Sequence, residues 1–99
     1  MGQPENKVEK KLCNEIKSIG GRAYKFISPG NNGVPDRIIY LPNGAVIFAE
    51  LKSPKGVLSK QQEFRIKEMR HMGQTVVILH SVPEVETFLS AISKEMESK

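Results

Sequence analysis

Apolar residues recur along this chain at two different spacings, and the change of spacing separates helices from strands. Residues 5–19 place an apolar side chain at every third or fourth position, which predicts an amphipathic helix. Gly20 and Gly21 follow and end that helix. The next apolar stretches are short, rich in β-forming residues and separated by turn residues, so they predict strands at 22–27, 36–41 and 45–52.

Helical spacing returns in the second half of the chain. Residues 59–72 predict a helix with Ser59 as its cap and with Phe64, Ile66, Met69 and Met72 as its apolar positions, of which Met69 and Met72 are expected to pack. A strand is expected at 74–79, and a last helix opens at Ser81. The order helix, three strands, helix, strand, helix predicts an α/β fold around a mixed four-stranded sheet. The step from 45 to 79 should be a right-handed parallel crossover.

Three charged residues are expected to meet at one edge of this sheet. Asn43-Gly44 is a strong hairpin signal between the second and third strands. Counting equally back and forward from that turn pairs Asp36 with Glu50. Glu50 and Lys52 are two residues apart and therefore share a face of their strand. Asp36, Glu50 and Lys52 should thus converge.

Two carboxylates beside a lysine suit a hard divalent cation such as Mg²⁺, which prefers oxygen ligands. Asp36 and Glu50 could supply two ligands and the backbone carbonyl of Leu51 a third. Lys52 could orient a water molecule for attack on a phosphate. Each piece also has an ordinary explanation, because an E-x-K pair on a strand is usually a solvated pair and Asp36 could simply cap the preceding loop.

The motifs together resemble the PD-(D/E)XK, or restriction-endonuclease-like, nuclease superfamily, and within it the VRR-NUC family. The resemblance lies in Gly33-Val34-Pro35-Asp36, in Glu50-Leu51-Lys52 after thirteen intervening residues, and in the phrase GVPDRIIYLPNG. It extends over residues 5 to about 89. It implies a restriction-endonuclease-like core and cleavage of DNA phosphodiester bonds that depends on Mg²⁺ or Mn²⁺. Carried over by residue, Asp36 and Glu50 become metal ligands and Lys52 the catalytic lysine.

The resemblance adds one residue from each of the first two helices. Gln62 matches a glutamine of the family's second helix, although its position three residues after Ser59 would also suit a simple capping box. Glu9 matches an acidic residue of the first helix and is expected to join the metal shell through water or a second ion. Glu5, one turn earlier, is the competing choice.

Small stand-alone proteins of this family resemble phage and bacterial nucleases that act as homodimers on branched DNA, including four-way (Holliday) junctions. By that analogy, branched DNA and a second copy of the chain are the expected partners. Two symmetric sites would suit two symmetric cuts.

Composition and charge are consistent with this interpretation. The chain has 99 residues, enough for a single domain over residues 1–99. Its net charge is +4, and residues 1–25 alone carry six bases and three acids, which suits a polyanionic partner. No apolar run is long enough to span a bilayer, so no membrane role is expected. The single Cys13 and the absence of an apolar leader indicate a reducing cytoplasm, and the family resemblance implies that of a bacterium or a phage-infected host cell.

Contacts to DNA phosphates and grooves are expected from basic and amide side chains near the site, although half or more of the lysines could be merely solvated. The candidates are Lys7, Lys10, Lys11, Arg22, Lys25, Asn31, Asn32, Arg37, Lys55 and Lys60. Arg37 could instead pair with a neighbouring carboxylate. Two other functions stay open: a DNA-binding module without catalysis, and a small protein-interaction domain.

Overall fold

The computed structural model describes residues 4–97, and side chains from residue 6 onward. The elements in chain order are α1 (Pro4–Ser18), β1 (Arg22–Lys25), β2 (Arg37–Tyr40), β3 (Val46–Leu51), α2 (Lys60–His71), β4 (Val76–Leu79) and α3 (Val82–Glu97). This order confirms the α/β fold expected from the sequence, with ends that differ by one or two residues. None of the helices within residues 4–97 is long and apolar enough to cross a membrane.

The four strands form one mixed sheet in the order β1-β2-β3-β4. β1 pairs antiparallel with β2, β2 pairs antiparallel with β3, and β3 pairs parallel with β4. In the β2–β3 hairpin, Arg37 lies opposite Ala49 and Tyr40 opposite Val46, which is the register counted from the Asn-Gly turn. The central position expected for the third strand is also confirmed.

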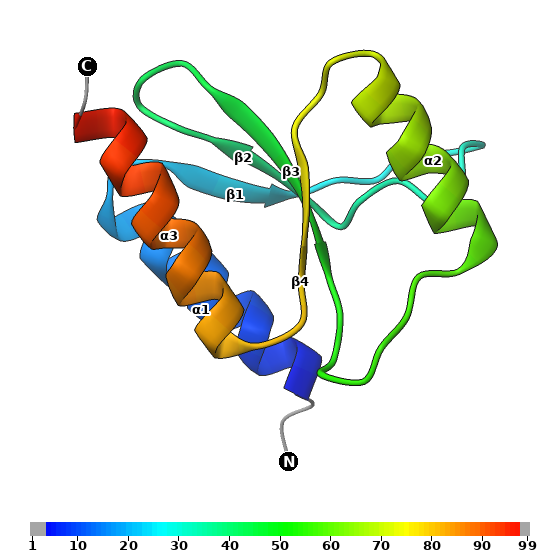
Figure 1. Ribbon diagram of the computed structural model, residues 1–99, viewed down its shortest axis with the longest axis horizontal. Coiled ribbons are helices and arrows are strands. Elements are labelled where there is room, and N and C mark those ends of the chain that lie inside the picture. Colours follow the sequence, from blue (N-terminus) through cyan, green and yellow to red (C-terminus); the bar gives the residue numbers. More distant parts are fainter. Residues whose placement is uncertain (1–3, 98–99) are drawn as a thin grey trace.

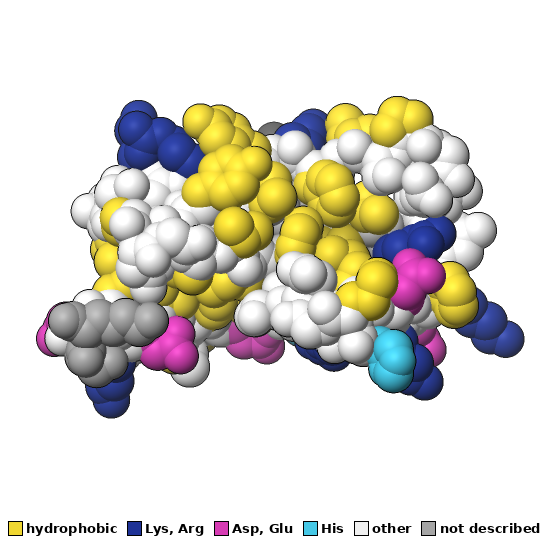
Figure 2. Space-filling model, turned by 90° about the horizontal axis from the view of Figure 1, so that it is seen from above, with side chains coloured by type: hydrophobic (Ala, Val, Ile, Leu, Met, Phe, Trp, Pro, Cys, Tyr) yellow, Lys and Arg dark blue, Asp and Glu magenta, His cyan; other side chains and the backbone are white. Residues whose placement is uncertain are grey.

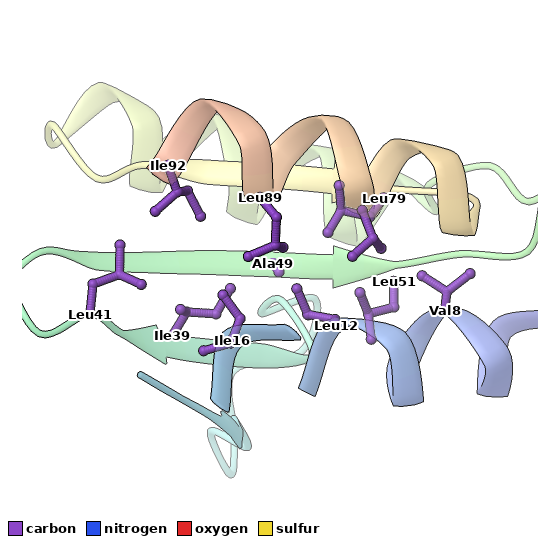
Figure 3. Packing of buried hydrophobic residues seen from close by; sticks show 11 residues of the cluster. Val8, Leu12, Ile16, Ile39, Leu41, Ala49, Leu51, Leu79, Leu89 and Ile92 are labelled. Atoms are coloured by element: carbon purple, nitrogen blue, oxygen red, sulfur yellow. The ribbon is translucent and has the colours of Figure 1, made fainter. Parts of the chain in front are cut away.

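Helices cover both faces of the sheet, but unequally. Figure 1 shows α1 and α3 side by side on one face and α2 on the other. The main core lies under α1 and α3, where Leu12, Ile39, Ala49 and Leu89 pack together (Figure 3). A smaller cluster lies under α2, where Ile66 and Met69 pack around Val76 of β4.

Strand alternation decides which face carries the candidate site. Ala49 and Leu51 of β3 point into the main core, so Glu50 between them points to the opposite face, on the side of α2. Lys52 follows Glu50 by two residues, so it lies on the same side, just beyond the end of the strand. Both charged side chains of the E-x-K motif therefore point toward the helix that carries Gln62.

The apolar residues of α2 are not equally buried, and the packing expected for Met72 was wrong. Ile66 and Met69 are buried, but Phe64 is 61% exposed and Met72 is 63% exposed. Successive residues of a helix turn by about 100°, so Phe64 points nearly opposite to Ile66, two positions further on. The small cluster under α2 needs only a narrow stripe of that helix.

Candidate active site

Asp36 is held at the beginning of β2 by bonds to both neighbouring strands. Its backbone oxygen accepts the Phe26 amide at 2.8 Å, which extends the β1–β2 pairing beyond the strand itself. Its carboxylate Oδ2 accepts the backbone N–H of Leu51 at 3.0 Å. This bond ties the start of β2 to the end of β3, so the structure brings Asp36 and the E-x-K motif to one place.

Glu50 is a buried carboxylate with one satisfied and one unsatisfied oxygen. Only 2% of the residue is exposed. Its Oε2 accepts from Gln62 Nε2 at 2.8 Å and lies 3.4 Å from Lys52 Nζ. Its Oε1 is buried and has no hydrogen-bond partner. Burial, and then the nearby negative charge of Asp36, raise the pKa of Glu50 to about 7, although the Lys52 ammonium opposes this rise.

The amide of Gln62 connects the helix end to the charged pair. Its Oε1 accepts both the Lys52 ammonium, at 2.9 Å, and the backbone N–H of Ser59, at 2.9 Å. The Ser59 hydroxyl in turn accepts the Gln62 backbone N–H, which completes a capping box. One side chain thus caps α2 and also contacts Glu50 and Lys52.

The loop before Asp36 packs directly against the first turn of α2. Gly33 has φ +89, and a Cβ there would lie 2.5 Å from the backbone oxygen of Gln61. Arg65 Nε also donates to the backbone oxygen of Asn32 at 3.3 Å. Sequence reasoning identified the turn-rich loop but missed this contact with the helix. The sequence signal for this contact is Gly33 in the G-x-P-D motif, because a side chain at that position would collide with the backbone of Gln61.

This contact leads to a stability prediction. Gly33→Ala should lower the free energy of unfolding by about 2 kcal/mol or more, because it adds a backbone collision to an unfavourable positive φ. Gly30→Ala is the matched control: φ is +81 and nothing lies within 4 Å of the added atom. Urea unfolding of both variants measures the difference. Equal losses would show that the loop does not press against α2 in solution.

Glu9 forms an ion pair with Arg37. Its Oε2 contacts Arg37 Nη2 at 2.6 Å, and Arg37 Nη1 also donates to the Ala23 backbone oxygen at 3.3 Å. The alternative of Arg37 pairing with a carboxylate is therefore the arrangement found. The side chain of Glu5, the competing first-helix acid, lies outside the described residues.

A hollow beside Asp36 leads toward this ion pair. Its volume is about 290 Å³, and its lining includes Glu9, Lys25, Asp36, Arg37 and Leu51. Glu9 thus borders the same space as Asp36 without touching it. Lys25, one of the lysines expected to contact DNA, lines the same hollow as Asp36.

The remaining basic candidates fall into separate groups. Lys7, Lys10, Arg22, Lys55 and Lys60 are exposed, as are the loop residues Asn31 and Asn32. Lys11 is engaged with Glu15 at 3.3 Å and Glu86 at 3.5 Å. Its ammonium therefore connects α1 to α3, and it belongs with the lysines that have a structural partner.

The oxygen atoms around Asp36 and Glu50 decide whether the site suits a divalent cation. Within the part of the chain that the structure describes, no three His, Cys, Asp or Glu side chains gather closely enough to hold an ion by themselves. What is present is a pair of carboxylates, one with an unpartnered buried oxygen. A site of two carboxylates, a backbone carbonyl and water is the oxygen-rich, partly hydrated set that Mg²⁺ prefers. The residues fit such an ion, with Asp36, Glu50 and the Leu51 carbonyl as its ligands.

Comparisons with known proteins agree with this geometry. Residues 3–83 match the family model described as the VRR-NUC domain. The chain is 40% identical over 92 residues to "Putative nuclease p44" of Acyrthosiphon pisum secondary endosymbiont phage 1, which covers 90% of this chain and 95% of that protein. A solved structure described as a VRR_NUC domain superimposes with a TM-score of 0.85 at 24% identity, covering 90% of this chain and 97% of that one. The last likeness shows the shared fold.

Proposed function

The chain belongs to the VRR-NUC domain family and is a nuclease, and on that premise we propose that it hydrolyses DNA phosphodiester bonds as an endonuclease dependent on Mg²⁺ or Mn²⁺. The observation that carries the metal dependence is the buried, unpartnered Oε1 of Glu50 close to Asp36. An unpaired carboxylate oxygen inside a protein is costly. A cation between Asp36 and Glu50 would remove that cost.

The residues of the site have separable tasks in this proposal. Asp36, Glu50 and the Leu51 carbonyl hold the cation. When bound, the ion would lower the pKa of a water molecule and stabilise the negative charge that builds on the phosphate. Lys52 is held by Gln62 at 2.9 Å and can donate a hydrogen bond to the attacking water or to the phosphate.

The bond changes follow from in-line hydrolysis. The oxygen of water forms a bond to phosphorus while the bond from phosphorus to the 3′ oxygen breaks. The leaving oxygen takes a proton and becomes a 3′-hydroxyl, and the phosphate stays on the 5′ side. Glu9 stays with Arg37 and contributes through the surrounding water, because its carboxylate is already occupied.

The proposed substrate is branched DNA, such as a four-way junction, cut inside a phage-infected bacterial cell. The phage origin of the nuclease-named relative and the uneven basic charge support this assignment. The test is cleavage of a labelled four-way junction, its linear duplex arms and its single strands, each in Mg²⁺, Mn²⁺ or EDTA. We expect cutting only with a metal and fastest on the junction. Equal rates on linear duplex would contradict the branched-substrate assignment.

We further propose that the protein acts as a homodimer, because one part of the sheet is left open. α2 covers only the β4 end of its face of the sheet. On the rest of that face Tyr24, Tyr40 and Val46 are 53%, 44% and 40% exposed. The two tyrosine rings contact each other edge to face with centroids 5.7 Å apart. Figure 2 shows hydrophobic side chains gathered across the middle of the molecule seen from above. An apolar area of this kind suits a two-fold contact.

The dimer gives a simple mass prediction. Sedimentation equilibrium should return twice the chain mass of 11.1 kDa at micromolar concentration. Tyr40→Glu should shift the protein to monomer, since it would place two charges in the apolar contact. Thr87→Glu, on the exposed side of α3, is the control and should leave the dimer intact. A wild-type protein that sediments at the single-chain mass would contradict the proposal.

A further inference from the structure

The outer side of α2 presents an aromatic ring that neither core uses. Phe64 is 61% exposed, and the Arg65 guanidinium carbon lies 5.6 Å from the centre of its ring. A single exposed apolar side chain is ordinary on a protein surface. Phe64 differs because it lines a groove together with cationic and amide side chains.

This groove lies between α2 and the loop that precedes β2. It encloses about 430 Å³, within the range of roughly 300–1,000 Å³ typical of small-molecule sites. It is lined by Gly30, Asn32, Lys60, Gln61, Phe64 and Arg65. In Figure 1 the loop, in cyan, passes beside α2. A bound molecule would therefore contact both the loop and the helix.

The two walls of the groove are fixed to each other. Arg65 Nε donates to the backbone oxygen of Asn32 at 3.3 Å, and its Nη1 contacts Glu68 at 2.8 Å. Gly33 lies against the backbone of Gln61. These contacts hold the groove open in one shape, so little ordering is needed when a molecule binds.

The chemistry of the lining selects the kind of molecule. Lys60 and Arg65 are cationic, Asn32 and Gln61 carry amides, and no lining residue is acidic. Flat aromatic surface next to cations is what proteins offer to single-stranded nucleic acid: the base stacks on the ring and the phosphate meets the cation. The same positive charge gives an uncharged peptide nothing to pair with.

We propose that this groove binds an unpaired nucleotide of the DNA substrate, with its base stacked on Phe64 and its phosphate beside Lys60. The inference rests on the proposed nuclease function and specifies part of its substrate. Gln61 lines the groove, and the next residue, Gln62, contacts Glu50 and Lys52. The nucleotide would lie across α2 from the cutting site, at about the 10–12 Å width of a helix. Unpaired bases at a branch point would thereby be placed close to the scissile bond.

The chain offers a clean optical test because it contains no tryptophan. Phe64→Trp places a single fluorophore in the groove, and Met72→Trp places one outside it, at the C-cap of α2 and at a position of similar exposure. Both are made in a Lys52→Ala background so that the DNA stays intact. A short single-stranded thymidine oligonucleotide should quench the Phe64→Trp emission at least about twofold and leave the Met72→Trp emission unchanged.

Fluorescence anisotropy of a dye on the same oligonucleotide separates the possible failures. Binding that quenches both variants equally, or neither, would overturn this inference and leave the nuclease proposal standing. No binding to this strand or to a four-way junction would overturn both. Quenching that depends on protein concentration without DNA would identify the groove as a contact between copies and would also overturn the inference. Phe64→Ala should weaken oligonucleotide binding about tenfold, with Met72→Ala as its control.

Discussion

Lys52→Ala is expected to lower the rate of Mg²⁺-dependent strand cutting by at least about 100-fold, the usual effect of removing a donor aimed at developing charge. The Lys52 ammonium is the only described cation in contact with Glu50, and it is oriented by Gln62 at 2.9 Å. The substitution removes the donor and leaves the Asp36 and Glu50 ligands in place. Single-turnover cutting of a labelled junction measures the effect.

Two comparisons make the Lys52→Ala result specific. Lys55→Ala removes an exposed lysine three residues further on and should cut at nearly the wild-type rate. Junction binding by Lys52→Ala, measured by anisotropy, should persist, because one of many cationic contacts is lost. A Lys52→Ala rate within tenfold of wild type, in a preparation free of contaminating nuclease, would remove this residue from the mechanism.

Glu50→Gln is expected to abolish cutting and yet to stabilise the protein at pH 8 in the absence of divalent metal. Unfolded, the Glu50 carboxyl has its ordinary pKa of 4.5, whereas in the fold its pKa is raised to about 7 by burial and by Asp36. Between these values the unfolded chain releases the proton more readily, so stability falls as pH rises. Below pH 4.5 the Glu50 carboxyl is protonated in both the folded and the unfolded protein, so no stability is lost. Above about pH 7 it is ionised in both, and the full loss of stability is present. It amounts to about 3 kcal/mol at most.

The measurement is thermal unfolding in EDTA from pH 5 to pH 8. Wild-type Tm should fall across this interval relative to Glu50→Gln, and at pH 8 the variant should melt on the order of 10 °C higher. Glu63→Gln, at an exposed acid of α2, should follow the wild type. Adding Mg²⁺ at pH 8 should raise Tm in the wild type and not in Glu50→Gln. Parallel pH curves for wild type and Glu50→Gln would contradict a raised pKa at this position.

Most of the fold follows from local patterns. The two apolar spacings locate every helix and strand, and the Asn43-Gly44 turn fixes the β2–β3 register that sets Asp36 near Glu50. What the pattern could not decide is how much of each helix is buried. α2 packs on a small cluster through a narrow stripe that holds Ile66 and Met69, and Phe64 lies outside that stripe at the surface.

The sequence predicts the strand residues of the candidate site more fully than its helix residues. Asp36, Glu50 and Lys52 meet because strand geometry allows little freedom. Gln62 had two competing roles, and only the tertiary contact between α2 and the sheet shows that the amide that caps the helix also contacts Lys52. Periodicity could not show that the Glu9 carboxylate pairs with Arg37, and its expected place in the metal shell, through water or a second ion, stays a prediction.

The most direct test of the central claim is the rate of junction cutting as a function of Mg²⁺ concentration, for wild type and Glu50→Gln purified side by side. The variant keeps an oxygen for Gln62 and Lys52 but loses the negative charge that would hold the cation. We predict saturable, Mg²⁺-dependent cutting by the wild type, none in EDTA, and none by Glu50→Gln at any Mg²⁺ concentration. Cutting by the wild type in EDTA, or by Glu50→Gln at a rate similar to wild type, would contradict a metal-dependent site at Asp36 and Glu50.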